Sequence, residues 1–209
     1  IRRITVGRLL GGTPAVFVAS AVNNSAIVTD VFAWRNDRFS NISYSRDSDT
    51  SVQTLRNYYV YAEDIDGDGV MELPSLITMK RVFPEQEGKQ KFLIRWFAMD
   101  LEGREMDKFF TFHNYLGGWY MQLASSWAPR VSVEQEGGKY TFYVWDEDYR
   151  QALDVFSIYA LTGGSREEDA TVDGRFAFYR AEGVVYAAKL EANAAAVSYT
   201  HLRAHETEA

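Results

Sequence analysis

The chain has 209 residues, of which 46% are hydrophobic and 15% aromatic, so it holds enough apolar material for one sizeable core or two small ones. Its formal net charge of -7 argues against a nucleic-acid partner, because binding to phosphates needs a basic face. The absence of cysteine excludes disulfides and thiolate metal sites. No apolar run is long enough to cross a membrane as a helix.

Short runs of β-branched and aromatic residues alternate along the chain with turn signals such as Asn36-Asp37 and Gly137-Gly138. The runs predicted as strands are 15–20, 27–34, 58–62, 73–79, 92–99, 109–112, 140–145, 155–161 and 175–179. Many short strands separated by such turns are typical of an all-β sandwich, barrel or propeller. The alanine-rich stretch 185–196 contains good helix formers and no breaker, and therefore predicts a helix.

Two parts of the chain, 4–44 and 58–112, resemble each other in their order of features. Each reads as a strand, a glycine-rich loop, a proline (Pro14 and Pro74), an apolar strand and a hairpin that contains Phe-Ala. Repeated units of this kind are the mark of propeller blades. A blade needs a neighbour on each face, so we expect further blades before Ile1.

The fold class predicted is therefore mainly β: a partial propeller of about two blades, then a small β-rich domain that ends in a helix. Residues 1–115 are assigned to the blades and 116–196 to the second domain, with a boundary expected near 115–118. A tail, 197–209, is expected to be adapter-derived.

The tail begins V-S-Y-T-H-L-R-A-H-E-T, which resembles the in-frame translation of a transposase sequencing adapter. His201 and His205 in it have the i, i+4 spacing of a helical zinc pair. We do not count them as a metal site, because the tail is not expected to be native sequence. His113 is then the one native histidine.

The most specific motif is the acidic sequence D-I-D-G-D-G-V-M-E, which begins at Asp64. Its spacing predicts that Asp64, Asp66 and Asp68 face the inside of a tight loop, with the Val70 carbonyl and the Glu72 carboxylate completing the set. Six or seven hard oxygen ligands are what calcium prefers, and crowded carboxylates repel one another unless a cation neutralises them. We predict a structural calcium ion as the cofactor. The alternative is an acidic turn that binds nothing.

The motif is not an EF-hand, because position 12 of that loop is Ser75 rather than Glu and no helix is predicted on either side. Between two strands it resembles the FG-GAP repeats of integrin-type propellers, with Glu72 in place of the final Asp, which leaves the denticity of that ligand open. Together with the later segment H-N-Y-L-G-G-W-Y at 113–120, the chain resembles cell-surface or lipoprotein-type proteins of Firmicutes. The resemblance implies a calcium-stabilised propeller in an extracytoplasmic location and implies no activity.

A second group of residues, rich in aromatic rings, is a candidate ligand-binding platform. Its members are His113, Asn114, Trp119, Tyr120 and Trp127. Aromatic faces beside hydrogen-bonding groups hold sugars or peptides in many proteins. The alternative is that these residues are ordinary core aromatics.

The acidic turn Asp146-Glu147-Asp148 supplies carboxylates for glycoside hydrolysis only if two of them face each other across a cleft. Consecutive residues in a turn point in different directions, so we expect them to be solvated.

The function predicted is a calcium-stabilised extracytoplasmic binding or structural module of a bacterial cell-surface protein, with no catalysis. The expected partners are carbohydrate or another surface protein. One alternative is a polysaccharide hydrolase or lyase with a cleft lined by Trp119, Trp127 and Trp145. Another is a spacer whose second half caps the propeller.

Overall fold

The computed structural model describes residues 1–22, 25–85, 90–114, 117–123 and 125–194. The fold is mainly β, with three antiparallel sheets and one short α-helix in this part of the chain. The strands are β1 (Arg3–Arg8), β2 (Pro14–Val22), β3 (Ala26–Arg35), β4 (Arg38–Asn41), β5 (Leu73–Thr78), β6 (Phe92–Met99), β7 (Glu105–Asn114), β8 (Trp119–Leu123), β9 (Val131–Glu136), β10 (Lys139–Trp145), β11 (Ala152–Thr162), β12 (Phe176–Ala181) and β13 (Val184–Leu190). The helix α1 is Arg166–Asp169, and short 3-10 turns are Val52–Thr54 and Ala128–Arg130.

The chain divides into two compact units. The first comprises Ile1–Ile77 and Leu93–Phe112, and the second comprises Thr78–Phe92 and the chain from His113 onward. The boundary predicted near 115–118 falls partly outside the described residues, and the assignment of blades and second domain stays a prediction. The tail 197–209, with its two histidines, also lies outside the described residues.

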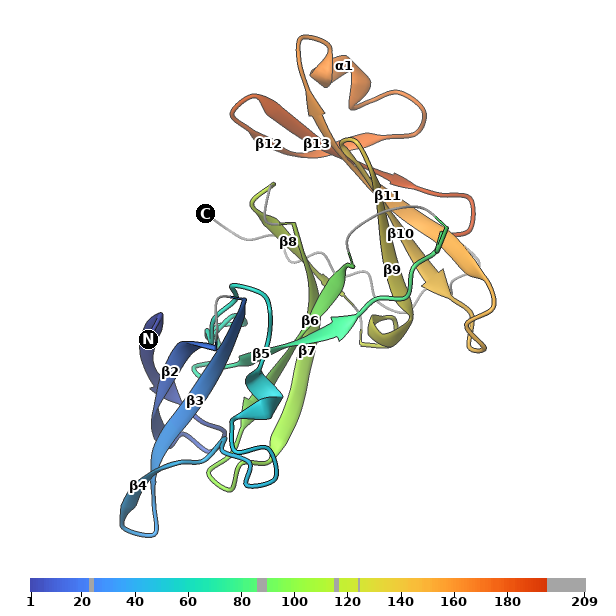
Figure 1. The fold of residues 1–209 in the computed structure, drawn as a ribbon. Coiled ribbons are helices and arrows are strands. Elements are labelled where there is room, and N and C mark those ends of the chain that lie inside the picture. The colour runs from blue at the N-terminus through green and yellow to red at the C-terminus, as the bar shows by residue number, and fades with distance from the viewer. Residues whose placement is uncertain (23–24, 86–89, 115–116, 124, 195–209) are drawn as a thin grey trace. The chain divides into compact units, whose positions relative to one another are not determined.

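The first unit begins with a sheet in the order β1-β2-β3-β4 (Figure 1). Successive side chains of a strand point to opposite faces of the sheet. Both faces of this sheet carry apolar side chains. One face is buried and carries Phe17, Val31 and Ala33. The turn between β3 and β4 has positive φ at Asn36 and Asp37, as a two-residue hairpin with a right-handed twist requires.

A second sheet has the order β5-β6-β7-β8. Its residues Leu73, Phe97 and Met99 form one buried cluster with Phe17 and Val31 of the first sheet. The first sheet and the β5-β6 part of the second sheet therefore share a core within the first unit, whereas β8 belongs to the second unit. Burial of these side chains contributes about 1.5–3 kcal/mol each.

The opposite side of the second sheet has a core of its own. Ile94, Trp96 and Phe109 cluster there with Val60, from the segment before the acidic loop. The indole of Trp96 donates a hydrogen bond to Thr111 Oγ1 at 2.8 Å. Both faces of β6 are thus packed against other elements of the first unit.

The outer face of the first sheet differs, because its apolar side chains reach solvent. Ile4 and Val6 of β1 are 59% and 72% exposed, and Trp34 and Phe39 are 65% and 52% exposed. The register places Ile4 opposite Val18, and Trp34 opposite Phe39, so these residues lie on the same side of the sheet. We call this surface the outer apolar face.

The loop between β4 and the acidic motif is held to β3 by a buried arginine. The Arg56 guanidinium donates to the Val60 carbonyl at 2.7 Å, to the Thr54 carbonyl at 2.7 Å and to Thr29 Oγ1 at 3.1 Å. Arg56 is 3% exposed, and its backbone pairs with Ile27. The guanidinium therefore satisfies acceptors that the fold has removed from water.

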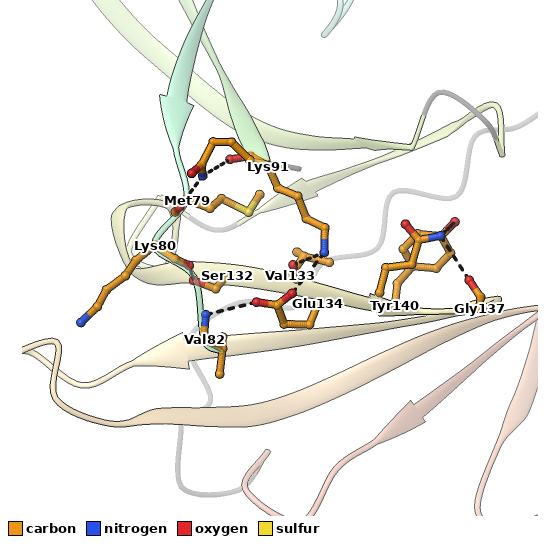
Figure 2. A network of polar contacts seen from close by, with 11 residues as sticks. Met79, Lys80, Val82, Lys91, Ser132, Val133, Glu134, Gly137 and Tyr140 are labelled. Atoms are coloured by element: carbon orange, nitrogen blue, oxygen red, sulfur yellow. Dashed lines mark hydrogen bonds and ion pairs between the residues drawn. The ribbon is translucent and has the colours of Figure 1, made fainter. Parts of the chain in front are cut away.

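The second unit contains a sheet in the order β12-β13-β11-β10-β9. Residues on either side of positions 86–89, among them Lys80, Val82 and Lys91, lie beside its edge strand β9, as Figure 2 shows. The Val82 N–H donates to Glu134 Oε1 at 3.1 Å, and the Lys91 ammonium donates to the Val133 carbonyl at 2.8 Å and to Glu134 Oε2 at 3.3 Å. The Lys91 contact covers a backbone carbonyl of β9, a kind of group that an edge strand otherwise leaves open to other chains.

The helix predicted over 185–196 is wrong in the part that the structure describes. Residues Val184–Leu190 form β13, which pairs with β11 on one side and β12 on the other. Val185 and Tyr186 favour a pleated surface, and the small Ala187 is fully buried between the neighbouring strands. Tertiary pairing has overridden the helix propensity of the alanines.

The strand predicted over 58–62 is also absent as a regular strand. This segment contributes the buried Val60, and it meets the start of β5 only through the bridge between Glu63 and Glu72.

Candidate metal site

The acidic motif forms a closed loop in the first unit, between the end of the 58–63 segment and β5. Glu63 and Glu72 close it with two backbone hydrogen bonds of 3.1 and 2.9 Å. The Met71 N–H donates to the carbonyl of Arg8 in β1 at 2.9 Å. The last residues of the loop are therefore tied to two separate parts of the unit.

Inside the loop, carboxylates accept hydrogen bonds from backbone N–H groups a few residues ahead. Asp66 Oδ1 accepts from Asp68 at 3.2 Å, Asp68 Oδ1 accepts from Val70 at 2.8 Å, and Asp64 Oδ2 accepts from Gly69 at 3.0 Å. Gly69 has φ of +85°, a conformation that costs an L-residue about 1–2 kcal/mol. These contacts fix the positions of the carboxylates.

Three of the carboxylates come together. Asp64, Asp66 and Glu72 each offer an oxygen within 4.8 Å of the others. Glu72 is fully buried, and its Oε2 accepts from the Ile65 N–H at 3.2 Å. Glu72 Oε1 and Asp64 Oδ1 are buried and have no hydrogen-bond donor. A buried carboxylate oxygen without a donor is costly, and a cation placed among the three would satisfy it.

The electrostatics of the loop agree with this geometry. Burial, and after it the negative charge of Asp66, raise the pKa of Glu72 to about 7. The protein alone therefore does not fully stabilise the charged form of this side chain.

A positive group, Lys108 of β7, lies beside the loop. Its Nζ donates to Asp68 Oδ2 and lies 3.7 Å from Asp66 Oδ2 and 3.9 Å from Glu72 Oε1. The hydrogen bond to Asp68 raises the pKa of Lys108 and lowers the pKa of Asp68. Nothing in the sequence around position 108 pointed to this contact, because it joins residues 40 positions apart.

The predicted ligands thus separate into three groups. Asp64, Asp66 and Glu72 form the carboxylate cluster, while Asp68 pairs with Lys108. The Val70 carbonyl stays a prediction. Carboxylate oxygens suit calcium, magnesium or manganese and do not suit the softer metals that favour thiolates.

The candidate ligand-binding residues lie in the second unit and have several different environments. His113 stacks on Tyr120, with ring centroids 5.0 Å apart, and Tyr120 is 52% exposed. The Asn114 side chain is buried and accepts from the Gly117 N–H at 3.0 Å. Of these residues, His113 and Tyr120 form a stacked pair that solvent reaches.

The remaining candidates are packed against other residues. The Trp119 indole meets the rings of Tyr140 and Tyr186 edge-on, and Trp127 is buried beside the Ala128–Arg130 turn. Trp145, proposed for a cleft, is buried and donates to Ser132 Oγ at 2.8 Å. These indoles contribute to packing, whether or not ligands also contact them.

The acidic turn after β10 is an exposed surface feature. Asp146 Oδ1 accepts from the Arg150 N–H at 2.7 Å, which holds the turn, while Glu147 and Asp148 are exposed. Asp148 lies 3.7 Å from the Arg150 guanidinium. This geometry matches the solvated turn expected from the sequence.

Comparison with protein-family models, with curated proteins and with solved structures finds no match for the chain. Within the described residues, no helix has the length and apolar character needed to span a membrane.

Proposed function

We propose that the chain is a calcium-stabilised binding or structural module of an extracytoplasmic, cell-surface protein. The observation that carries the proposal is the pair of buried carboxylate oxygens, Glu72 Oε1 and Asp64 Oδ1, which have no donor and lie beside Asp66. A calcium ion there would neutralise the cluster and tie β5 to the loop. Calcium is preferred over magnesium because the irregular loop offers oxygen atoms without the octahedral order that magnesium demands.

The proposed architecture is a partial propeller of the FG-GAP kind. Four features support it. The two sheets pack face to face, and Pro14 and Pro74 occupy the beginnings of β2 and β5, each after a glycine-containing loop. Phe32 and Phe97 then follow in β3 and β6. The acidic loop occupies the same place before β5 that Gly11-Gly12 occupies before β2.

The outer apolar face is consistent with that architecture, because a further sheet would cover it as the second sheet covers the inner face. In the isolated chain, we expect two copies to associate through this face. Val6→Lys and Trp34→Lys should each return the protein to a monomer in sedimentation analysis. Tyr59→Lys is the control, since Tyr59 is 56% exposed elsewhere in the same unit. A wild-type chain that stays monomeric at high concentration would contradict this prediction.

The proposed partners are carbohydrate or another surface protein, and no catalytic step is part of the proposal. The exposed ring of Tyr120, stacked on His113, is the most accessible of the candidate contact points.

Calcium is expected to raise the stability of the first unit. At 100 times its dissociation constant it should add about 2.7 kcal/mol, which for a unit of about 100 residues is roughly 10–20 °C in melting temperature. Asp66→Asn and Glu72→Gln should remove the rise, because each replaces a charged ligand by a neutral one of the same shape. The measurement is thermal melting in millimolar calcium and in chelator.

Asp148→Asn is the matched control, since Asp148 is an exposed acid outside the loop and should leave the calcium response intact. The proposal fails if wild type gains nothing from calcium, or if Asp66→Asn gains as much as wild type.

A further inference from the structure

Lys108 occupies an unusual place in β7. In the pairing of β6 with β7, Trp96 lies opposite Phe109 and Phe97 lies opposite Asp107. Lys108 is therefore the extra residue of a β-bulge, with no residue of β6 opposite it. Bulges re-aim a side chain at the position of the extra residue.

The re-aimed side chain ends among the carboxylates of the loop. Its ammonium is hydrogen-bonded to Asp68 Oδ2 and lies 3.7 Å from Asp66 and 3.9 Å from Glu72. The side chain of Lys108 is 15% exposed. It provides one positive charge to a group of carboxylates that would otherwise repel one another.

Two of these carboxylates, Asp66 and Glu72, also belong to the cluster proposed to bind calcium. A divalent cation at that cluster and an ammonium within about 4 Å of the same oxygens would repel each other. They would also compete for the same lone pairs. The charge of Lys108 therefore opposes the binding of the metal ion while it stabilises the loop without one.

We propose that Lys108 is a tethered counter-ion that exchanges with the divalent cation. In the absence of metal its ammonium neutralises the loop, and when metal binds it withdraws from Asp66 and Glu72. Lys108 thereby sets the affinity of the site, in a way that rests on the proposed function of the loop.

Two effects of opposite sign follow from this exchange. Lys108→Met, which keeps the length of the side chain and removes its charge, should tighten calcium binding by about fivefold or more. That factor corresponds to the upper end of the range for exposed ion pairs, because the side chain of Lys108 is largely buried. In chelator, the same variant should melt at a lower temperature than wild type, and the difference should shrink or reverse in saturating calcium.

The test is calorimetric titration of calcium chloride into the full chain, with melting curves in chelator and in calcium. Lys108→Gln is a second neutral variant if Lys108→Met folds poorly, and Lys108→Arg keeps the charge and should bind as wild type does. Arg104→Met is the control for net charge, because Arg104 is 76% exposed and pairs with Asp100 and Glu102 outside the loop. Its calcium affinity should stay within about twofold of wild type.

The outcomes separate the two proposals. Equal or weaker calcium binding by the neutral Lys108 variants, with wild type binding normally, overturns the exchange and leaves the calcium site standing. No binding by any variant overturns both. Tighter binding by Lys108→Met than by a wild type that itself binds calcium supports both proposals.

Discussion

Replacing Arg56 by methionine is expected to lower the free energy of unfolding of the first unit by about 3 kcal/mol or more. The substitution keeps an apolar stem of similar length and removes the three donors that reach Thr29, Thr54 and Val60. Each buried acceptor left without a donor costs about 1–3 kcal/mol. Arg56→Lys should recover only part of the loss, since one ammonium cannot reproduce the planar fork of a guanidinium.

Denaturant unfolding monitored by tryptophan fluorescence would measure this effect. Arg38→Met is the matched control, because Arg38 is exposed in β4. Its stability should stay within about 0.5 kcal/mol of wild type. A similar small change in Arg56→Met would show that the buried network does not stabilise the loop between β4 and the acidic motif.

Acid is expected to destabilise the second unit through His113. Burial lowers the pKa of His113 to about 4, whereas an unfolded histidine titrates near 6.5. The folded state thus binds fewer protons between these values, so the contribution is complete above pH 6.5 and is lost as the pH falls toward 4. Allowing for partial exposure, the loss is about 2 kcal/mol.

His113→Phe should keep the stacking on Tyr120 and remove this pH dependence. The comparison is the difference in unfolding free energy between wild type and His113→Phe, measured from pH 7 to pH 5 in millimolar calcium. A difference that stays constant over this range would contradict the prediction that His113 makes the stability depend on pH.

The sequence was most informative where a feature is local. The acidic loop could be predicted because its hydrogen bonds join residues two to five positions apart, as between Asp64 and Gly69. The Asn36-Asp37 hairpin is equally local, since only the conformations of its two central residues are required. The mainly β class followed from the many short apolar runs.

The features that the sequence did not predict depend on distant contacts. Lys108 reaches the loop only because β7 contains a bulge, and a bulge depends on the register between two strands. The segment 78–92 joins the second unit through partners such as Glu134, more than 40 positions away. The alanines of β13 favour a helix in isolation, and only their neighbours β11 and β12 make them a strand.

The loop that carries the carboxylates is already closed by the backbone hydrogen bonds between Glu63 and Glu72 and by the hydrogen bond that the Gly69 N–H donates to the Asp64 carboxylate. A metal ion that binds there does not have to wait for the chain to fold around it, so little ordering entropy opposes its arrival. The speed of exchange would then depend on how fast the ion sheds its water and how fast one lysine side chain moves aside.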